Sequence, residues 1–232
     1  MKKIGIIGGL GPEATVDYYQ RIIDTFKASN DGSLDYPEII IYSVNMKIFI
    51  GRMSQKQYRE ATDYLVEKIR GLERAGADFA ALSANTPHQL YDEIIKQVNI
   101  PVLSIVEATC KRAKQMVLKR LALFGTLFTM NATFYSEVFK KNDILIVTPD
   151  ENQKEYIHHK LFTEIELGIF KNETREALIK IMRQMQDQHH IEGVILGCTE
   201  LPLILPEAHY SGLPMLNTTE IHVKAIVDYC LA

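Results

Sequence analysis

Cysteine is scarce in this sequence, and its scarcity excludes several kinds of protein. The 232 residues include three cysteines, Cys110, Cys198 and Cys230. An odd and sparse set of this kind does not form the disulfide framework of a small secreted domain, and it is typical of a cytoplasmic protein with reduced thiols. Neither the cysteines nor the histidines are spaced as zinc ligands, so we expect no metal site.

Long apolar runs and a strong charge of either sign are also missing. The net charge of −3 gives no basic surface for nucleic acid or for a membrane. The apolar run at residues 4–10 is short, contains three glycines and is soon followed by Glu13. We interpret it as a buried first strand rather than a signal peptide or a membrane span. With 47% apolar residues, the chain can form one or two domains with sizeable cores.

The sequence does contain a regular alternation of strand and helix patterns. Short runs rich in β-branched residues alternate with helical periodicities, which is typical of parallel sheets covered by helices on both faces. The expected strands are residues 3–9, 38–44, 79–84, 101–106, 120–126, 143–149, 193–198 and 214–217. The expected helices are residues 12–29, 55–76, 88–98, 106–118, 130–141, 153–170, 174–190 and 218–232.

This pattern repeats after about half of the chain. Gly8 and Gly125 close the first and fifth strands and lie 117 residues apart, whereas Ala84 and Cys198 end the third and seventh and lie 114 apart. We therefore predict an α/β fold of two similar four-stranded halves related by a pseudo-twofold, with a ligand cleft between them at the carboxyl ends of the strands. The predicted halves are residues 1–104 with 214–232, and residues 105–213.

A glycine-rich corner follows the first strand, in the stretch GIIGGLGPEAT. Gly9 and Gly11 partly match a dinucleotide-binding loop, but Ala14 replaces its last glycine and no acidic residue ends the second strand. We therefore favour a second interpretation over NAD binding. In it, a tight turn at Gly9 brings the backbone close to a small anion at the N-terminus of the next helix.

Two further corners carry polar side chains. Cys198 follows the seventh strand in GVILGCTE, where a thiol can act as a nucleophile or a proton-transfer base, although most free cysteines are buried and inert. Cys110 and Cys230 lie within helical patterns and are expected in the core. Thr126 and Thr129 follow the fifth strand and either cap a helix or bind a carboxylate.

His88 and Lys154 each have two interpretations. His88 follows Pro87 near the start of a helix, where it either orients the corner at Asn85 and Thr86 or caps the helix. Lys154 follows the sixth strand and is either a surface lysine or a ligand-binding residue. The adjacent histidine pairs at 158–159 and 189–190 diverge on their helices and are expected on solvated faces.

Together, these corners resemble the aspartate/glutamate racemase family of cofactor-independent amino-acid racemases. The resemblance runs through the whole chain, in the motifs IGIIGGLGP, NTPH, GT..TM and GCTE. Glu200 in GCTE is similar to the aspartate racemase branch. The resemblance implies the two-half fold, no cofactor, a homodimer, and a small acidic amino acid such as aspartate or glutamate as the substrate.

The resemblance also implies roles for individual residues. Racemases of this family place one cysteine from each half on either face of the α-carbon, and Cys198 is the implied proton-transfer residue of the second half. The implied ligands of the α-carboxylate and its neighbouring groups are Asn85, Thr86, Thr126, Thr129 and Thr199. Lys154 matches a position that binds the side-chain carboxylate.

The first corner departs from the family pattern. Ala84 occupies the position of the first cysteine and cannot transfer a proton, while Ser83 faces the other way along the strand. An arginine expected after the second strand has no clear counterpart in Lys47 or Arg52. Two hypotheses follow: a racemase that works weakly or one-sidedly through Cys198, and a non-catalytic protein that binds acidic amino acids.

Overall fold

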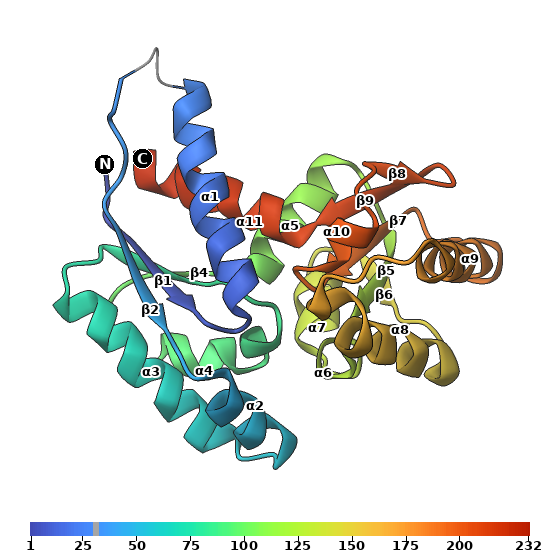
Figure 1. Ribbon diagram of the computed structural model, residues 1–232, viewed down its shortest axis with the longest axis horizontal. Helices are drawn as coiled ribbons and strands as arrows, with labels where there is room; N and C mark the ends of the chain where they lie inside the picture. Colours follow the sequence, from blue (N-terminus) through green and yellow to red (C-terminus); the bar gives the residue numbers. More distant parts are fainter. Residues whose placement is uncertain (30–32) are drawn as a thin grey trace. The chain divides into compact units, whose positions relative to one another are not determined.

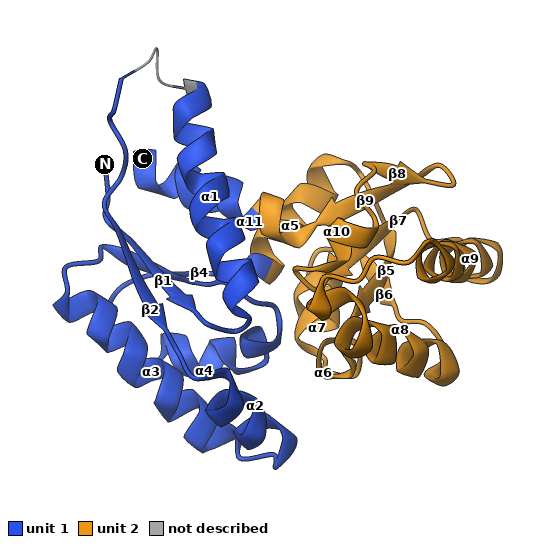
Figure 2. Ribbon diagram, in the orientation of Figure 1, with its two compact units in different colours: residues 1–105, 222–232 blue, residues 106–221 orange. Residues whose placement is uncertain are grey.

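The computed structural model describes residues 1–29 and 33–232, which form two compact units. The first unit comprises residues 1–105 and 222–232, and the second comprises residues 106–221 (Figure 2). Residues 214–221, which the sequence-based division placed in the first half, lie in the second unit. They lie there because strand β9 (Leu213–Asn217) pairs with β7 (Gly193–Gly197).

The first unit contains a four-stranded parallel sheet with the strand order β2-β1-β3-β4. Figure 1 labels β1, β2 and β4 of this sheet. Its strands are β1 (Ile4–Gly8), β2 (Ile39–Ser43), β3 (Phe79–Leu82) and β4 (Val102–Leu103). Its helices are α1 (Pro12–Ser29), α2 (Met46–Ser54), α3 (Tyr58–Arg74), the 3₁₀ helix η1 (Thr86–Leu90), α4 (Tyr91–Ile95) and most of α11 (Thr218–Leu231).

Helices cover both faces of this sheet, which explains why its central strands are apolar throughout. On one face, Ile4 and Ile6 of β1 pack in one core with Tyr18 of α1 and Ile226 of α11. Side chains alternate along a strand, so Gly5 faces the opposite side. A Cβ atom there would lie 3.1 Å from Leu72 of α3, so this glycine allows α3 to approach the sheet closely.

The second unit contains a five-stranded sheet with the order β6-β5-β7-β9-β8, parallel except for β8. Besides β7 and β9, its strands are β5 (Arg120–Gly125), β6 (Leu145–Val147) and β8 (His209–Tyr210). Its other elements are α5 (Ile105–Gln115), α6 (Leu127–Met130), α7 (Phe134–Lys140), α8 (Glu151–Thr163), η2 (Ile165–Leu167), α9 (Asn172–His189) and α10 (Leu201–Ile204). On one face of the sheet, Phe124 and Leu196 pack with Leu161 of α8 and Met182 of α9.

The two sheets share their strand order and their register. If β8 is left out, both sheets have the same strand order: the second strand along the chain comes first, followed by the first, the third and the fourth. In the first sheet, Ile7 of β1 pairs with Leu82 of β3. In the second sheet, Phe124 of β5 pairs with Leu196 of β7. Two residues beyond Leu82 and Leu196 come Ala84 and Cys198, so these residues occupy equivalent positions in the two units.

The predicted α/β fold with two largely parallel sheets is confirmed, with one correction to the strand count. The second sheet has a fifth strand, β8, which joins antiparallel to β9 through the pairs His209–Pro214 and Tyr210–Leu213. The sequence analysis also missed the short helices α2, α6 and α10. In the described ranges, no helix has both the length and the apolar character needed to cross a lipid bilayer.

Candidate active site

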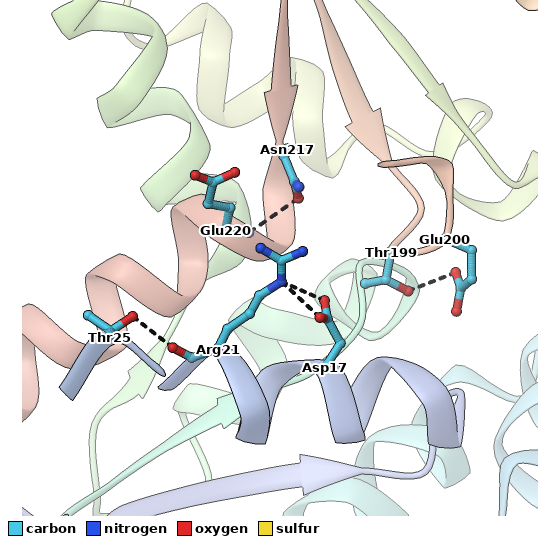
Figure 3. Close-up of polar contacts among 7 residues, drawn as sticks. All are labelled: Asp17, Arg21, Thr25, Thr199, Glu200, Asn217 and Glu220. Carbon is cyan, nitrogen blue, oxygen red and sulfur yellow. Dashed lines mark hydrogen bonds and ion pairs between the residues drawn. The ribbon is translucent and has the colours of Figure 1, made fainter. Parts of the chain in front are cut away.

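Cys198 lies directly after β7 and is hydrogen-bonded to a carboxylate. Its thiol donates to Oε2 of Glu200 at 3.0 Å. The hydroxyl of Thr199 donates to the same oxygen at 2.8 Å (Figure 3). The short corner between β7 and α10 therefore holds a thiol and a carboxylate together, with Thr199 fixing the orientation of the carboxylate.

The surroundings of Cys198 favour the protonated thiol. Only 8% of the residue is exposed. Burial, followed by the negative charge and the hydrogen bond of Glu200 and by the charge of Glu166, raises the pKa of the Cys198 thiol well above its ordinary value. The thiol is therefore protonated in the ligand-free protein, and it can act as a base only after it has lost this proton.

Glu166, in η2, is a member of this group that the sequence analysis missed. The acid–base atoms of Glu166, Cys198 and Glu200 all lie within 4.8 Å of one another. No other group of three such side chains is gathered closely enough to surround a metal ion in residues 1–29 and 33–232. We interpret this group as a thiol–carboxylate site, because the Cys198 thiol lies within hydrogen-bond distance of Glu200.

Thr126 and Thr129 form the corner between β5 and α6. Thr126 is the N-cap of α6, and its hydroxyl oxygen accepts from the amide of Thr129 at 3.4 Å. The two hydroxyl oxygens are also 3.4 Å apart, and both residues are buried. The capping role that the sequence allowed is therefore present. It leaves the hydroxyl group of Thr129 as a potential donor to a carboxylate.

Lys154 lies in the first turn of α8, and its ammonium group is already paired. Nζ donates to Oε1 of Glu151 at 2.6 Å and to Oδ1 of Asn131 at 2.9 Å. The Lys154 side chain is 9% exposed, whereas that of Glu151 is 79% exposed. Lys154 is therefore not an ordinary surface lysine, and a ligand carboxylate would have to replace the exposed carboxylate of Glu151.

The corner after β3 contains Ala84, Asn85 and Thr86, and His88 holds it in place. His88 Nδ1 lies 2.9 Å from the carbonyl oxygen of Ala84, and the amide of Ile105 donates to His88 Nε2 at 3.1 Å. Since Nε2 accepts, Nδ1 carries the proton and donates to Ala84. His88 therefore orients this corner, which is one of the two roles that the sequence allowed. Both of its ring nitrogens form hydrogen bonds with the backbone.

Ser83 and Gly9 are also engaged inside the first unit. The Ser83 hydroxyl donates to the carbonyl of Ile7 at 3.1 Å and lies 3.4 Å from the hydroxyl of Thr15. The amide of Gly9 donates to the Thr15 hydroxyl at 2.8 Å, so it is not directed at an anion as the sequence analysis expected. Gly9 has φ +82°, and a Cβ atom there would lie 2.4 Å from the carbonyl oxygen of Val44. This glycine is required by the turn itself.

The other basic residues considered for the first unit lie on its surface or contact protein groups. Arg52, in α2, donates to the carbonyl of Glu60 at 3.0 Å and stacks over the ring of Tyr64 at 4.9 Å. Lys47 is exposed. Neither side chain is brought to the corner at residues 84–86 by a contact that the structure records.

Cys110 and Cys230 are core residues, as expected. They are 2% and 1% exposed, and the thiol of Cys230 donates to the carbonyl of Lys2 at 3.0 Å.

Thr219 has a buried hydroxyl with no hydrogen-bond partner among the described residues. It follows β9, whose partner strand β7 leads to Cys198. In the sequence, the only indication of a polar residue at this position is the run NTTE after the last strand.

A second buried histidine lies in the first unit. His222, at the C-terminal part of the chain, has Nδ1 2.9 Å from the hydroxyl of Tyr18 and Nε2 3.1 Å from the carbonyl of Leu103. Burial is the main cause that lowers the pKa of His88 to about 4 and that of His222 to about 3. Both side chains are therefore neutral at physiological pH.

Acidification is expected to destabilise the protein through these two histidines. In the unfolded chain they bind protons near pH 6.5, but in the folded chain only near pH 4 or below. The two histidines therefore leave the free energy of unfolding at its full value above pH 6.5. As the pH falls toward 4, this free energy decreases by up to about 1.4 kcal/mol per pH unit for each histidine. Urea unfolding between pH 5 and 7 measures this slope.

His88→Asn should reduce the dependence of the unfolding free energy on pH by the contribution of about one proton, which is about 1.4 kcal/mol per pH unit. His189→Asn, at an exposed position, should leave this dependence unchanged. A slope that is the same in wild type and His88→Asn would contradict the assignment of His88 as a buried neutral group.

Comparison with known proteins identifies relatives along the whole chain. Residues 7–226 match the model of the family described as Asp/Glu/Hydantoin racemase. The chain is 30% identical over 233 residues to the broad specificity amino-acid racemase RacX of Bacillus subtilis, covering 99% of this chain and 98% of that protein.

Solved structures are similar over the same length. An aspartate racemase homologue from Pyrococcus horikoshii matches with a TM-score of 0.88 and 34% identity, covering all of both chains. The aspartate racemase of Picrophilus torridus, with a TM-score of 0.75 and 21% identity over 99% of this chain and 94% of that one, shares the fold. The chain therefore belongs to the Asp/Glu/hydantoin racemase family.

Proposed function

We propose that this protein transfers protons at the α-carbon of an amino acid, with Cys198 as the acid–base group. The hydrogen bond from the Cys198 thiol to Glu200, at the end of a strand in a racemase-family chain, is the observation that carries the proposal. A thiol paired with a carboxylate is suited to proton transfer because the carboxylate can hold the proton that the thiol releases.

The proposed reaction uses these two groups in sequence. Glu200 takes the thiol proton, and the thiolate then removes the α-proton, so that an S–H bond forms as the C–H bond breaks. The electron pair left on the α-carbon is delocalised into the α-carboxylate. Hydroxyl donors at Thr126 and Thr129, and side chains at Asn85 and Thr86, are proposed to bind that carboxylate. The thiol exchanges its proton with water and returns a proton to the carbon, and Glu200 then gives its own proton back to the thiolate.

The reaction is proposed to be one-sided. Ala84 has no acid–base group, and the side chains beside it are engaged: Ser83 donates to a backbone carbonyl and His88 uses both ring nitrogens. Exchange of the α-proton with solvent should therefore be faster than racemisation, because the second face of the carbon has no proton donor of its own.

The proposed substrate is an acidic amino acid such as aspartate or glutamate. Lys154 supports it, since its buried ammonium group is neutralised by one highly exposed carboxylate that a ligand could replace. The relative in B. subtilis is named for broad specificity, so the substrate test must include neutral and basic amino acids as well.

The test is incubation of both enantiomers of aspartate, glutamate, alanine and lysine in D2O. Proton NMR follows α-proton exchange, and chiral chromatography follows configuration. We expect faster exchange for aspartate and glutamate, and we expect Lys154→Met to reduce that preference about tenfold, as the loss of a charged hydrogen bond does. Lys180→Met, at an exposed position of α9, is the matched control. Equal rates for all four amino acids in the wild type would contradict the acidic substrate.

The alternative is a non-catalytic protein that binds acidic amino acids. The absence of an ionisable group at Ala84 favours it, and so does the protonated state of Cys198. Calorimetric binding of aspartate without α-proton exchange for either enantiomer would support this alternative and exclude the proposed reaction.

A further inference from the structure

Glu166 is the residue near Cys198 for which no role has yet been given. It comes from η2, a part of the second unit separate from the corner that carries Glu200. Its carboxylate oxygen lies within 4.8 Å of both the Cys198 sulfur and the Glu200 carboxylate. Two different elements therefore place negative charge beside one buried thiol.

The turn that carries Glu166 is held firmly by its neighbours. The Glu164 carboxylate accepts from Lys160 at 2.6 Å, from Lys171 at 3.0 Å and from the hydroxyl of Thr174 at 2.5 Å. These three partners lower the pKa of Glu164 to about 2, so it remains charged. The next residue, Ile165, is 1% exposed and packs in the core with Leu161 and Cys198.

The C-terminal side of this turn is fixed as well. The amide of Gly168 donates to the carbonyl of Ile165 at 3.0 Å, and the amide of Ile169 donates to that of Glu164 at 2.9 Å. Gly168 has φ +73°, a conformation that glycine adopts without strain. With Glu164 and Ile165 anchored and the chain reversed at Gly168, the position of Glu166 is set by the fold.

Lys154 and His158 of α8, the helix before this turn, are engaged with other groups. Lys154 donates to Glu151 and Asn131. His158 accepts from the amide of Leu127 at 3.3 Å, and burial lowers its pKa, so it is neutral. The charges that act on the thiol from η2 and from the start of α10 are the carboxylates of Glu166 and Glu200.

We propose that Glu166 is a positioning residue that acts through Cys198: held by the anchored η2 turn, it adds a second negative charge beside the thiol and so adds to the effect of burial and of Glu200, which keep the proton on sulfur in the ligand-free protein. This inference rests on the proposed function, in which Cys198 moves the proton. The ligand-free protein therefore holds Cys198 in its protonated form. The positive ammonium group of an arriving amino acid offsets the two carboxylates and allows the thiol to become a base.

Alkylation of Cys198 by iodoacetamide measures the state of this proton directly, because the thiolate is the reactive form. Folded protein is treated across a range of pH, and peptide mass spectrometry separates Cys198 from Cys110 and Cys230. We expect Glu166→Gln to lower the midpoint of the alkylation profile by about one pH unit, which gives about tenfold faster alkylation on the acid side of the wild-type midpoint. Glu166→Asp should restore most of the wild-type profile.

Glu155→Gln, at an exposed position of α8, is the matched control and should match the wild type. Glu166→Ala should show the same shift as Glu166→Gln, and it provides a second neutral variant if one of them does not fold. Neutral variants that retain the wild-type profile, while Glu200→Gln shifts it, would overturn the role of Glu166.

This experiment is independent of turnover. If wild-type protein shows no α-proton exchange but the Glu166 variants shift the alkylation profile, the proposed function fails and the link between Glu166 and the thiol stands. If exchange occurs and the profile does not shift, the proposed function stands and the role of Glu166 is wrong.

Discussion

Cys198→Ala is expected to reduce α-proton exchange by about 10² to 10⁴-fold, the usual contribution of one acid–base group. The variant keeps Glu200 and Thr199 but removes the sulfur to which the α-proton is transferred in the proposed reaction. Exchange of the α-proton of aspartate in D2O, followed by NMR, measures the loss. Cys198→Ser provides a second variant of nearly the same size, whose hydroxyl group is far too weak an acid to replace the thiol.

The other two cysteines are the controls for this experiment. Cys110→Ala and Cys230→Ala remove core thiols that are 2% and 1% exposed, and that of Cys230 donates to the backbone carbonyl of Lys2. Both variants should retain exchange near the wild-type rate once the folded fraction is taken into account. Calorimetric binding of aspartate to Cys198→Ser shows whether its site is intact. Exchange that survives in a Cys198 variant with an intact site would mean that another group moves the proton.

Most of the fold could be predicted because the sequence signals are local and strong. The helix expected at residues 12–29 is the observed α1 (Pro12–Ser29), since its apolar residues recur at helical spacing and Pro12 begins it. The strand β8 could not be predicted, because its two residues, His209 and Tyr210, carry no periodicity. They form a strand only because β9 offers an open edge to pair with.

The site was predicted less completely than the fold. Cys198 could be found because a thiol directly after an apolar strand stands out, and its repeat partner at position 84 marks the same edge of the first sheet. Glu166 could not be found, because residues 153–170 have one continuous helical pattern. The structure ends α8 at Thr163 and turns the chain at Gly168. The cause is the set of contacts that Glu164 makes with α9 and its flank, and such long-range contacts are not visible in a local pattern.

Wild-type protein is expected to exchange the α-proton of one enantiomer with retention of configuration and to leave the other enantiomer unchanged. In the proposed reaction Cys198 removes and returns a proton, whereas Ala84 has no acid–base group to do the same. Incubation of separate D- and L-aspartate samples in D2O, with exchange and configuration measured independently, checks this directly. Deuterium should appear in one sample without the appearance of the other enantiomer.

Ala84→Cys is expected to raise racemisation by about 10² to 10⁴-fold, because it supplies the missing acid–base group. Positions 84 and 198 are equivalent in the register of their sheets. The resemblance to the racemase family implies a thiol at both. His88 holds the backbone carbonyl of residue 84 through its own ring, so the substitution changes the side chain without removing that contact. Ala84→Ser is the matched control: it adds a group of similar size that cannot transfer a proton readily and should gain nothing.

Two outcomes would contradict this account of Ala84 in different ways. If the wild type racemises aspartate rapidly in both directions, a group other than residue 84 serves the second face. His88 is a poor candidate for that group, because both of its nitrogens are bonded to the backbone and burial lowers its pKa to about 4. A bound water then becomes the first candidate. If Ala84→Cys folds and binds aspartate yet gains no racemisation, residues 84 and 198 do not act on the same carbon. Their equivalent positions in the two sheets then reflect the internal repeat alone and have no role in catalysis.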